Sequence, residues 1–363
     1  MRVGLHSNQL SIRGSEVALW DYADGLEARG HFVRVFADAT SPYNDPDVVR
    51  RFQERFDTVL YGSWDEVKDF GGLDFLYMIK AGLRDDRIPS RGVRYGVHAV
   101  FPYCEPHGDV YAYVSRWLSA CMSRGRLPYV PHIVELPNVN GDLRESLGIP
   151  ASAVVFGRHG GYDTFDISWA WKAIEKTLER RQNAWFVFLN TAPGVTHPRV
   201  IHLEATADPV EKVRFINTCD AMLHARRQGE TFGLAPAEFS ACNKQVFTYG
   251  RSHERAHIDM LGDKAILYRS ESDLVKRLES FQPRPDEDWN AYRGFRRDVV
   301  MDDFERVFLS IEHPVSGERS AVAGRSAAKG CSGPYWIVRR AIPARSPLRR
   351  LVPWLRRSLR GGQ

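Results

Sequence analysis

CDAMLHARRQGETFGLAPAEFSACNKQVFT, residues 219–248, is the stretch that decides the fold. It predicts a strand in AMLHA, a glycine-containing loop, a helix through EFSACN and a second strand in QVFT. Glu230 lies in the loop, and Glu238 lies in the first turns of the helix. In an open α/β sheet, ligands bind beyond the carboxyl ends of the strands, where helix N-termini present free amide groups. We therefore expect both carboxylates to reach one ligand, with the amides of Gly233 and Leu234 between them facing an anion.

Strands alternate with helices on both sides of this stretch. In the first half an apolar strand at 1–7 precedes a helix at 14–30 whose apolar residues recur at helical spacing. In the second half a strand at 152–157 precedes a similar helix at 168–181. The alternation predicts an α/β protein with two Rossmann-like parallel-sheet domains that face one cleft.

The expected domain boundaries lie where this alternation is interrupted. Turn residues in PNVNGDLRESLGIPAS, from residue 137 on, predict a hinge. We therefore expect an N-terminal acceptor domain at 1–140 and a C-terminal domain at 141–312 that ends in a helix near 301–313. A tail at 313–363 follows.

The composition of the chain is typical of a globular protein with reduced cysteines. The chain has 363 residues, of which 43% are hydrophobic and 26% are charged, and these values are typical of globular proteins. Its five cysteines are odd in number and form no C-x-x-C motif, which favours reduced thiols and a cytoplasmic location. The N-terminus lacks the apolar core of a secretory signal, and no run is long enough for a spanning helix.

The positive net charge comes from the tail. From Arg319 onward there are eleven basic residues and no acidic one, so the first 318 residues carry 39 basic and 45 acidic groups. We therefore expect no nucleic-acid partner for the folded part. Drawn as a helix, 346–362 places its leucines on one face and most of its arginines on the other, which suits an anionic membrane surface and a peripheral location there. Pro353 interrupts such a helix, and a solvated or folded-back cationic tail is the alternative.

Two further glycine-containing loops follow predicted strands. GRHGG, 157–161, places Gly160 and Gly161 where their amides can approach a phosphate that Arg158 neutralises. In the first half, SIRGSE places Gly14 and Ser15 in a similar loop before a helix.

Taken together, these motifs resemble the retaining, nucleotide-sugar-dependent glycosyltransferases of the GT-B fold, of the large family-4 type (glycosyl transferases group 1). The similarity spans roughly residues 1–312 and is carried by FGRHGG, by 219–248 and by RGSEVALWDYADGLEARGH. The resemblance implies that Glu230 holds the donor sugar, that Glu238 binds the ribose hydroxyls and that Arg158 contacts the diphosphate. It also implies that His98 in YGVHAVF lies beside the reacting sugar.

The sequence departs from the family pattern at one place. The family has a lysine a few residues after the loop arginine, where this chain has Tyr162, Asp163 and Thr164. Either Arg226 or its neighbour Arg227 replaces that cation, or the amides of the glycine loop suffice, or donor affinity is weak.

The activity that the resemblance implies is transfer of a sugar from a nucleotide-diphosphate sugar to a glycan, lipid-linked or other acceptor. It implies retention of configuration, no metal ion and no cofactor besides the donor, because preorganised cations and amides stabilise the departing diphosphate. The alternatives are a non-catalytic nucleotide- or glycan-binding GT-B scaffold and a GT-B sugar-nucleotide epimerase.

Three motifs have simpler interpretations. His98 lies between Val97 and Ala99 at the end of an apolar strand, so a core histidine is nearly as well supported as a catalytic one. HERAH, 253–257, matches the zinc-protease pattern, but the residues that extend that pattern are missing, and we expect no metal there. The acidic run at 286–288 lies in a proline-rich polar segment and is interpreted as a solvated loop.

Overall fold

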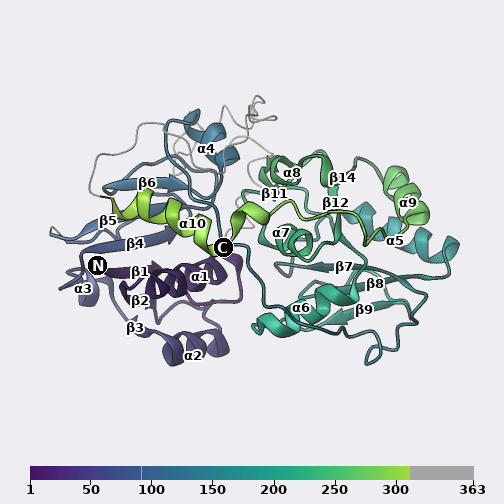
Figure 1. Ribbon diagram of the computed structural model, residues 1–363, viewed down its shortest axis with the longest axis horizontal. Coiled ribbons are helices and arrows are strands. Elements are labelled where there is room, and N and C mark those ends of the chain that lie inside the picture. The colour runs from purple at the N-terminus through teal and green to yellow at the C-terminus, as the bar shows by residue number, and fades with distance from the viewer. Residues whose placement is uncertain (91, 311–363) are drawn as a thin grey trace. The chain divides into compact units, whose positions relative to one another are not determined.

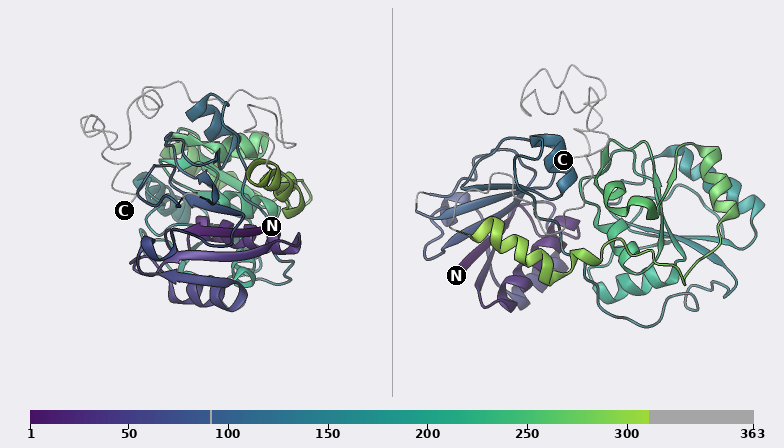
Figure 2. Two further views of the ribbon diagram at one scale, coloured as in Figure 1. Left: turned by 90° about the vertical axis from the view of Figure 1, so that its left-hand side faces the viewer. Right: turned by 45° about the horizontal axis from the view of Figure 1, so that its top comes forward.

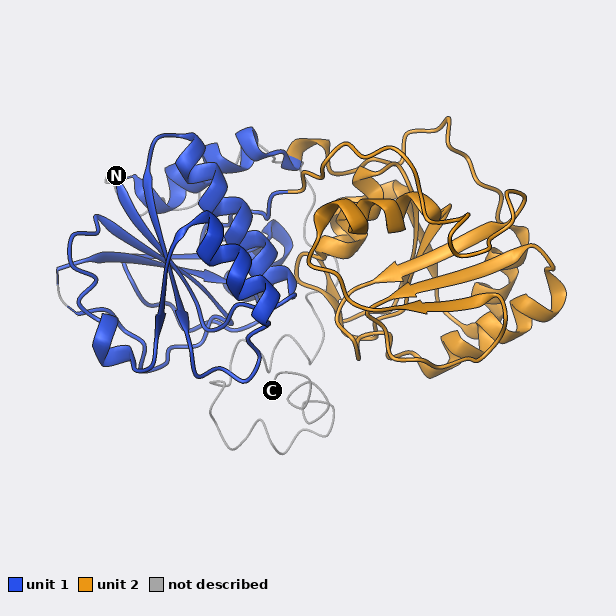
Figure 3. Ribbon diagram, turned by 90° about the horizontal axis from the view of Figure 1, so that it is seen from below, with its two compact units in different colours: residues 1–133, 295–363 blue, residues 134–294 orange. Residues whose placement is uncertain are grey.

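The computed structural model describes residues 1–90 and 92–310. These form two compact units, shown in different colours in Figure 3. Of the described residues, unit 1 comprises those up to 133 and 295–310, and unit 2 comprises 134–294. No helix among the described residues combines the length and the apolar character needed to cross a membrane.

Unit 1 is built on a six-stranded sheet in which every pairing is parallel (Figure 1). The strand order is β3-β2-β1-β4-β5-β6, so the chain reverses its direction of travel across the sheet between β1 and β4. The strands are β1 Arg2–Ser7, β2 Phe32–Asp38, β3 Asp57–Tyr61, β4 Phe75–Lys80, β5 Arg94–Ala99 and β6 Val110–Tyr113. The helices α1 Gly14–Ala28, α2 Pro46–Arg55 and α3 Trp64–Val67 connect the first four strands, and α4 Arg116–Ser123 follows β6.

Unit 2 repeats the same plan. Its sheet has the order β14-β12-β10-β7-β8-β9, with β7 and β10 in the places that β1 and β4 take in unit 1. The strands are β7 Val154–His159, β8 Ala184–Leu189, β9 Val200–Leu203, β10 Ala221–His224, β12 Gln245–Tyr249 and β14 Ala265–Tyr268. The main helices are α5 Ser168–Arg180, α6 Pro209–Thr218, α7 Leu234–Ala241, α8 Ala256–Leu261 and α9 Glu271–Ser280. Beside the main sheet, β11 Gly229–Glu230 pairs with β13 Glu254–Arg255.

Local sequence explains where these elements form. β4 reads FLYMIK, and all six of its residues are buried, as expected for a central strand of a parallel sheet covered on both faces. α2 begins at Pro46 after Asp45, whose carboxylate accepts the backbone amides of Asp47 and Val48. This N-cap satisfies two of the helix's unpaired donors. The predicted α/β architecture with two parallel sheets is thus confirmed.

The last described helix returns to unit 1, which corrects the domain assignment predicted from the sequence. The sequence predicts that this helix closes the second domain; it is α10 Arg297–Phe304, followed by the π-helical turn Glu305–Leu309. Instead α10 packs along α1 in unit 1, as Figure 2 shows from two directions. The first boundary falls after residue 133 rather than at 140.

Aromatic packing explains this return. Phe304 lies with its ring centroid 5.0 Å from those of Tyr22 and Tyr77. Phe308 fits against β5 because Gly96 has no side chain: a Cβ there would lie 2.7 Å from the Phe308 ring. The helix therefore completes the core of unit 1. The tail at 313–363, with its predicted membrane-binding helix, lies outside the described residues.

Candidate active site

The paired glutamates lie at the point in unit 2 where the sheet changes direction. β7 ends in Arg158 and His159, and its neighbour β10 ends in His224. In doubly wound α/β sheets, ligands bind beyond the carboxyl ends of the strands at such a switch point. The loop after β10 carries Glu230, and α7 carries Glu238.

Glu230 is held by two basic side chains from the same segment. Its Oε2 accepts a hydrogen bond of 2.7 Å from Nη1 of Arg226, and its Oε1 lies 3.2 Å from Nε2 of His224. Burial raises the pKa of Glu230, but Arg226 and the hydrogen bond from His224 outweigh burial and hold that pKa below its ordinary value. Glu230 is therefore a carboxylate near neutral pH, with its side chain still 20% exposed. It is placed to accept hydrogen bonds from a ligand and to stabilise positive charge.

Glu238 is buried and carries two partners that the sequence did not indicate. Lys212 of α6 donates to Oε1, and Nε2 of His159 lies 3.0 Å from Oε2. Burial raises the pKa of Glu238, but Lys212 and His159 outweigh it and lower the pKa to about 2. Since unfolding restores the ordinary pKa of 4.5, this stabilisation is complete above about pH 4.5 and is lost as the pH falls toward 2. A ligand hydroxyl that binds this carboxylate must share it with Lys212.

The predicted amide site at Gly233 and Leu234 has the expected backbone form. Gly233 is the N-cap of α7, with φ of 92°, and no side chain caps the helix there. A Cβ on Gly233 would lie 3.0 Å from Cβ of Glu230, so glycine is what lets the helix start close to that carboxylate. The first amides of α7 therefore begin next to Glu230, and their contact with an anion stays a prediction.

Arg158, which the sequence predicts to contact a diphosphate, is buried at the end of β7. It is only 3% exposed, and its two terminal nitrogens donate to two loops: to Asn190 and Thr191 on one side, and to Gly161 and Thr164 on the other. Burial lowers its pKa to about 10, so it remains charged near neutral pH. In this arrangement Arg158 organises the loops, and both of its terminal nitrogens are engaged by loop acceptors.

The glycine loop after β7 is shaped by the same arginine. The carbonyl of Gly161 accepts from Arg158 at 2.9 Å, and the carbonyl of Gly160 accepts from Nδ2 of Asn190 at 2.8 Å. Thr164, in the segment where the family has its lysine, accepts from Arg158 and donates to Gly161. Arg226, one suggested replacement for the lysine, is engaged by Glu230. Hydrogen bonds thus hold the glycine loop after β7. Thr164 takes part in them, in the segment where the family has a lysine.

The prediction that His98 is catalytic is corrected. His98 is fully buried in β5, with Nδ1 2.6 Å from the hydroxyl of Tyr77 and Nε2 2.9 Å from the carbonyl of Val130. Since Nε2 must donate to the carbonyl, Nδ1 accepts from Tyr77. Burial lowers the pKa of His98 to about 4, so the ring is neutral. It is a core histidine with both nitrogens satisfied.

The first glycine loop contains a buried carboxylate. Gly14 and Ser15 begin α1 as predicted, and the next residue, Glu16, is 2% exposed. Its oxygens accept from Ser7 at 3.0 Å, from Ser11 at 2.7 Å and from Ser15 at 2.9 Å. Burial raises the pKa of Glu16, while the three hydroxyls lower it less. Glu16 thus ties the end of β1 to the start of α1.

HERAH does not form the helix that a zinc site of this pattern requires. Glu254 and Arg255 belong to the strand β13, and α8 starts only at Ala256. Among the described residues no cluster of three or more histidine, cysteine or acidic side chains is arranged to hold a metal ion.

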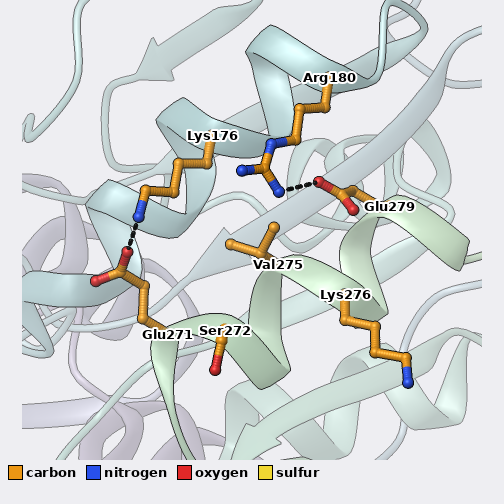
Figure 4. A pocket seen from close by; sticks show the side chains of 7 residues that line it. All are labelled: Lys176, Arg180, Glu271, Ser272, Val275, Lys276 and Glu279. Atoms are coloured by element: carbon orange, nitrogen blue, oxygen red, sulfur yellow. Dashed lines mark hydrogen bonds and ion pairs between the residues drawn. The ribbon is translucent and has the colours of Figure 1, made fainter.

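A surface hollow lies between α5 and α9 (Figure 4). Two ion pairs link its sides, Lys176 to Glu271 at 2.6 Å and Arg180 to Glu279 at 3.2 Å. These two ion pairs join α5 to α9. Because their charges neutralise each other, the hollow is a poor match for a charged ligand.

The sequence missed Lys212 and His159, which bind Glu238, and His224, which binds Glu230. His224 stands in the quoted stretch, two residues before Arg226, so its place at a strand end was a usable signal. Lys212 gave no such signal, because it reaches Glu238 from a helix 26 residues earlier.

The chain is similar to known proteins in its fold but not in its sequence. No protein-family model matches the chain, and no curated protein matches its sequence. Among solved structures it resembles HepE of Anabaena in complex with UDP and glucose, with a TM-score of 0.66, 13% identity and coverage of 84% of this chain and 98% of HepE. It also resembles WaaG, a glycosyltransferase involved in lipopolysaccharide biosynthesis, with a TM-score of 0.59, 12% identity and coverage of 84% and 99%. A third is sucrose-phosphate synthase of Thermosynechococcus elongatus, with a TM-score of 0.60, 14% identity and coverage of 84% and 98%.

The two six-stranded parallel sheets and these likenesses identify the architecture. The chain is an α/β protein with the GT-B fold, which it shares with glycosyltransferases.

Proposed function

We propose that this protein is a glycosyltransferase that takes its sugar from a nucleotide-diphosphate sugar. The observation that carries the proposal is the placement of Glu230, Glu238 and the start of α7 together at the switch point of unit 2. Carboxylate, amides and carboxylate follow each other there in the order in which sugar, diphosphate and ribose follow each other in such a donor. The structure of HepE with UDP-glucose adds support from a protein of the same fold.

In the proposed reaction Glu230 faces the donor sugar and Glu238 accepts the ribose hydroxyls. As the sugar–phosphate bond breaks, negative charge grows on the diphosphate, and the amides at the start of α7 stabilise it. Since Glu230 stays ionised, it can stabilise the positive charge that grows on the sugar ring. The acceptor hydroxyl bonds to the anomeric carbon on the same face from which the diphosphate departs, and its proton passes to the departing phosphate oxygen. Attack on that face gives retention of configuration, and no metal ion or further cofactor takes part.

One observation favours the non-catalytic alternative. The terminal nitrogens of Arg158 are engaged by loop groups, and the family's lysine is absent, so one diphosphate cation of the family pattern is occupied and the other is missing. A GT-B scaffold that binds a nucleotide or glycan without transferring it needs neither cation. Turnover of a bound donor, measured directly, separates the two functions.

A thermal-shift screen tests nucleotide binding. Among UDP, GDP and ADP and their sugars, we expect one nucleotide series to raise the unfolding midpoint, because a ligand that binds only the native state stabilises it by about 2.7 kcal/mol at one hundred times its Kd. In calorimetry, Glu238→Ala should weaken binding of that nucleotide about tenfold or more, since it removes a charged acceptor of ribose hydroxyls.

The matched control is Glu211→Ala. Glu211 lies on α6 beside Lys212, but it is exposed and pairs only locally with Arg214 at 2.8 Å. It should leave nucleotide affinity unchanged. Unaltered affinity in Glu238→Ala would remove Glu238 from the site, and a screen without any stabilising nucleotide would contradict the proposed function.

We further propose a cytoplasmic enzyme whose basic tail brings it to a membrane-held acceptor, such as a lipid-linked glycan. The support is the sequence alone: eleven basic and no acidic residues from Arg319 onward, each worth roughly 1 kcal/mol near an anionic surface. Full-length protein should co-sediment with anionic vesicles, and less so at high salt, whereas a chain truncated after residue 318 should stay in solution. Equal sedimentation of the two chains would contradict a membrane role for the tail.

A further inference from the structure

HERAH contributes the strand β13, which lies beside the strand that carries Glu230. The backbone of β13 runs parallel to β11, with Gly229 opposite Glu254 and Glu230 opposite Arg255. The amide of Glu254 donates to the carbonyl of Gln228 at 2.7 Å, and the Gln228 side chain donates to Oε1 of Glu254 at 2.6 Å. Two consecutive residues of the motif thus pair with the residues that carry the site.

The contact between these strands is close enough to fix the backbone of the loop. Gly229 has φ of 80°, and a Cβ on it would lie 1.9 Å from the carbonyl oxygen of Glu254, so only glycine fits. Ser252, just before the motif, donates to the carbonyl of Arg226 at 3.2 Å. The segment 252–255 therefore contacts the backbone of the loop along residues 226–230, which include Glu230.

A line of hydrogen bonds runs from the motif to the carboxylate of Glu230. Nε2 of His257 lies 2.9 Å from Oγ1 of Thr248, and the same hydroxyl lies 2.8 Å from Nδ1 of His224. Nε2 of His224 lies 3.2 Å from Oε1 of Glu230. The side chains of His257 and Thr248 are fully buried and that of His224 is nearly so, which makes these hydrogen bonds inaccessible to competing water.

The positions of the protons along this line follow from its two ends. Glu230 is ionised and accepts, so Nε2 of His224 carries a proton. In a neutral His224 ring, Nδ1 then accepts the hydroxyl proton of Thr248. The oxygen of Thr248 then accepts from Nε2 of His257. This leaves Nδ1 of His257, which has no partner among residues 1–90 and 92–310, as a bare acceptor. The opposite direction would bury an unpaired N–H at that nitrogen, and buried unpaired donors are rarer than unpaired acceptors.

From these contacts we infer that His257 and Thr248 are positioning residues for Glu230. They fix the ring orientation and tautomer of His224, so that its N–H points at the carboxylate, which otherwise could rotate toward Arg226 alone. The inference rests on the proposed function in that Glu230 is taken to face the donor sugar. The hydrogen-bonded line itself stands on the geometry, so it can be tested without any substrate.

Thr248→Val and Thr248→Ser form the test pair. Valine keeps the shape of threonine but can neither donate to His224 nor accept from His257, while serine keeps the hydroxyl. In nitrogen NMR of histidine-labelled full-length protein, we expect Nε2–H tautomers for His224 and His257 in the wild type and in Thr248→Ser. In Thr248→Val the Nδ1 signal of His224 should move to that of a nitrogen without a hydrogen bond. An Nδ1–H tautomer at His224, or identical signals in all three proteins, would overturn the inference.

Turnover of UDP-glucose measures the positioning effect. Thr248→Val should lower kcat about 10-fold to 100-fold, because a misplaced catalytic group loses that much, while the Kd for UDP stays unchanged and Thr248→Ser keeps most of the activity. The control is Thr177→Val, which removes another fully buried hydroxyl of unit 2, one that donates to the carbonyl of Ala173 at 2.7 Å away from the line. Equal kcat in Thr248→Val and Thr177→Val would overturn a positioning role. A wild type that neither binds nor turns over any nucleotide sugar would instead contradict the proposed function, and the NMR result would still decide the proton positions.

Discussion

Glu230→Gln is expected to lower the turnover of donor by at least about 100-fold, the typical loss when one preorganised charged group is removed from a reacting centre. The glutamine amide keeps the size of the carboxylate but not the charge that stabilises the sugar ring. Because the sugar half of the donor is absent from the free nucleotide, the affinity for that nucleotide should barely change. Steady-state kinetics and calorimetry on the same preparations measure both quantities.

Two comparisons make this result specific. Glu238→Gln should show the opposite pattern, with weakened nucleotide binding, because Glu238 is proposed to bind ribose. Added chelator should leave wild-type turnover unchanged, and a strict requirement for a divalent ion would contradict the proposed metal-free transfer. Near-normal turnover in Glu230→Gln would remove Glu230 from the reacting centre.

His98→Ala should reduce stability rather than chemistry. The substitution leaves the Tyr77 hydroxyl and the Val130 carbonyl without their partner and opens a cavity beside Phe308. Large-to-small changes in a core cost about 2–5 kcal/mol, and we expect a loss in that range in urea unfolding. Tyr77→Phe removes only one hydrogen bond and should cost about 1 kcal/mol. A catalytic His98 would give the reverse result, with unchanged stability and a strongly reduced turnover of folded protein.

The same histidine has a pH signature. Its pKa is about 4 in the folded chain and returns to the ordinary 6.5 on unfolding, so the unfolded state binds more protons between these values. The wild type therefore loses stability through His98 as the pH falls from about 6.5 toward 4.

Local patterns in the sequence were sufficient for the architecture. Strand–helix alternation predicted both parallel sheets, and the quoted stretch placed Glu230 before α7 and Glu238 within it, as the structure shows. Such features depend on neighbours a few residues apart, and these neighbours are visible in the sequence.

The surroundings of individual site residues could not be predicted, because they depend on partners far away in the sequence. His98 is a core residue because of Tyr77 and Val130, and Glu238 is shared with Lys212 of another helix. Arg158 was expected at a ligand because glycines follow it, whereas loops around Thr164 and Thr191 bind its guanidinium. No local spacing reports these contacts, so residue type and position alone suggested the wrong environment for His98 and gave no sign of the loop contacts of Arg158.

The return of α10 to unit 1 has a consequence for how the chain folds as it is made. Unit 2 is an uninterrupted segment, 134–294, so all of it has been synthesised before α10 is. The core of unit 1 lacks Phe304 and Phe308 until α10 has been synthesised. Until then Tyr22, Tyr77 and the surface of β5 at Gly96 lack the aromatic rings that cover them. During synthesis unit 2 can therefore fold completely before unit 1 does. Unit 1 exposes apolar surface until α10 has been made and packs against it.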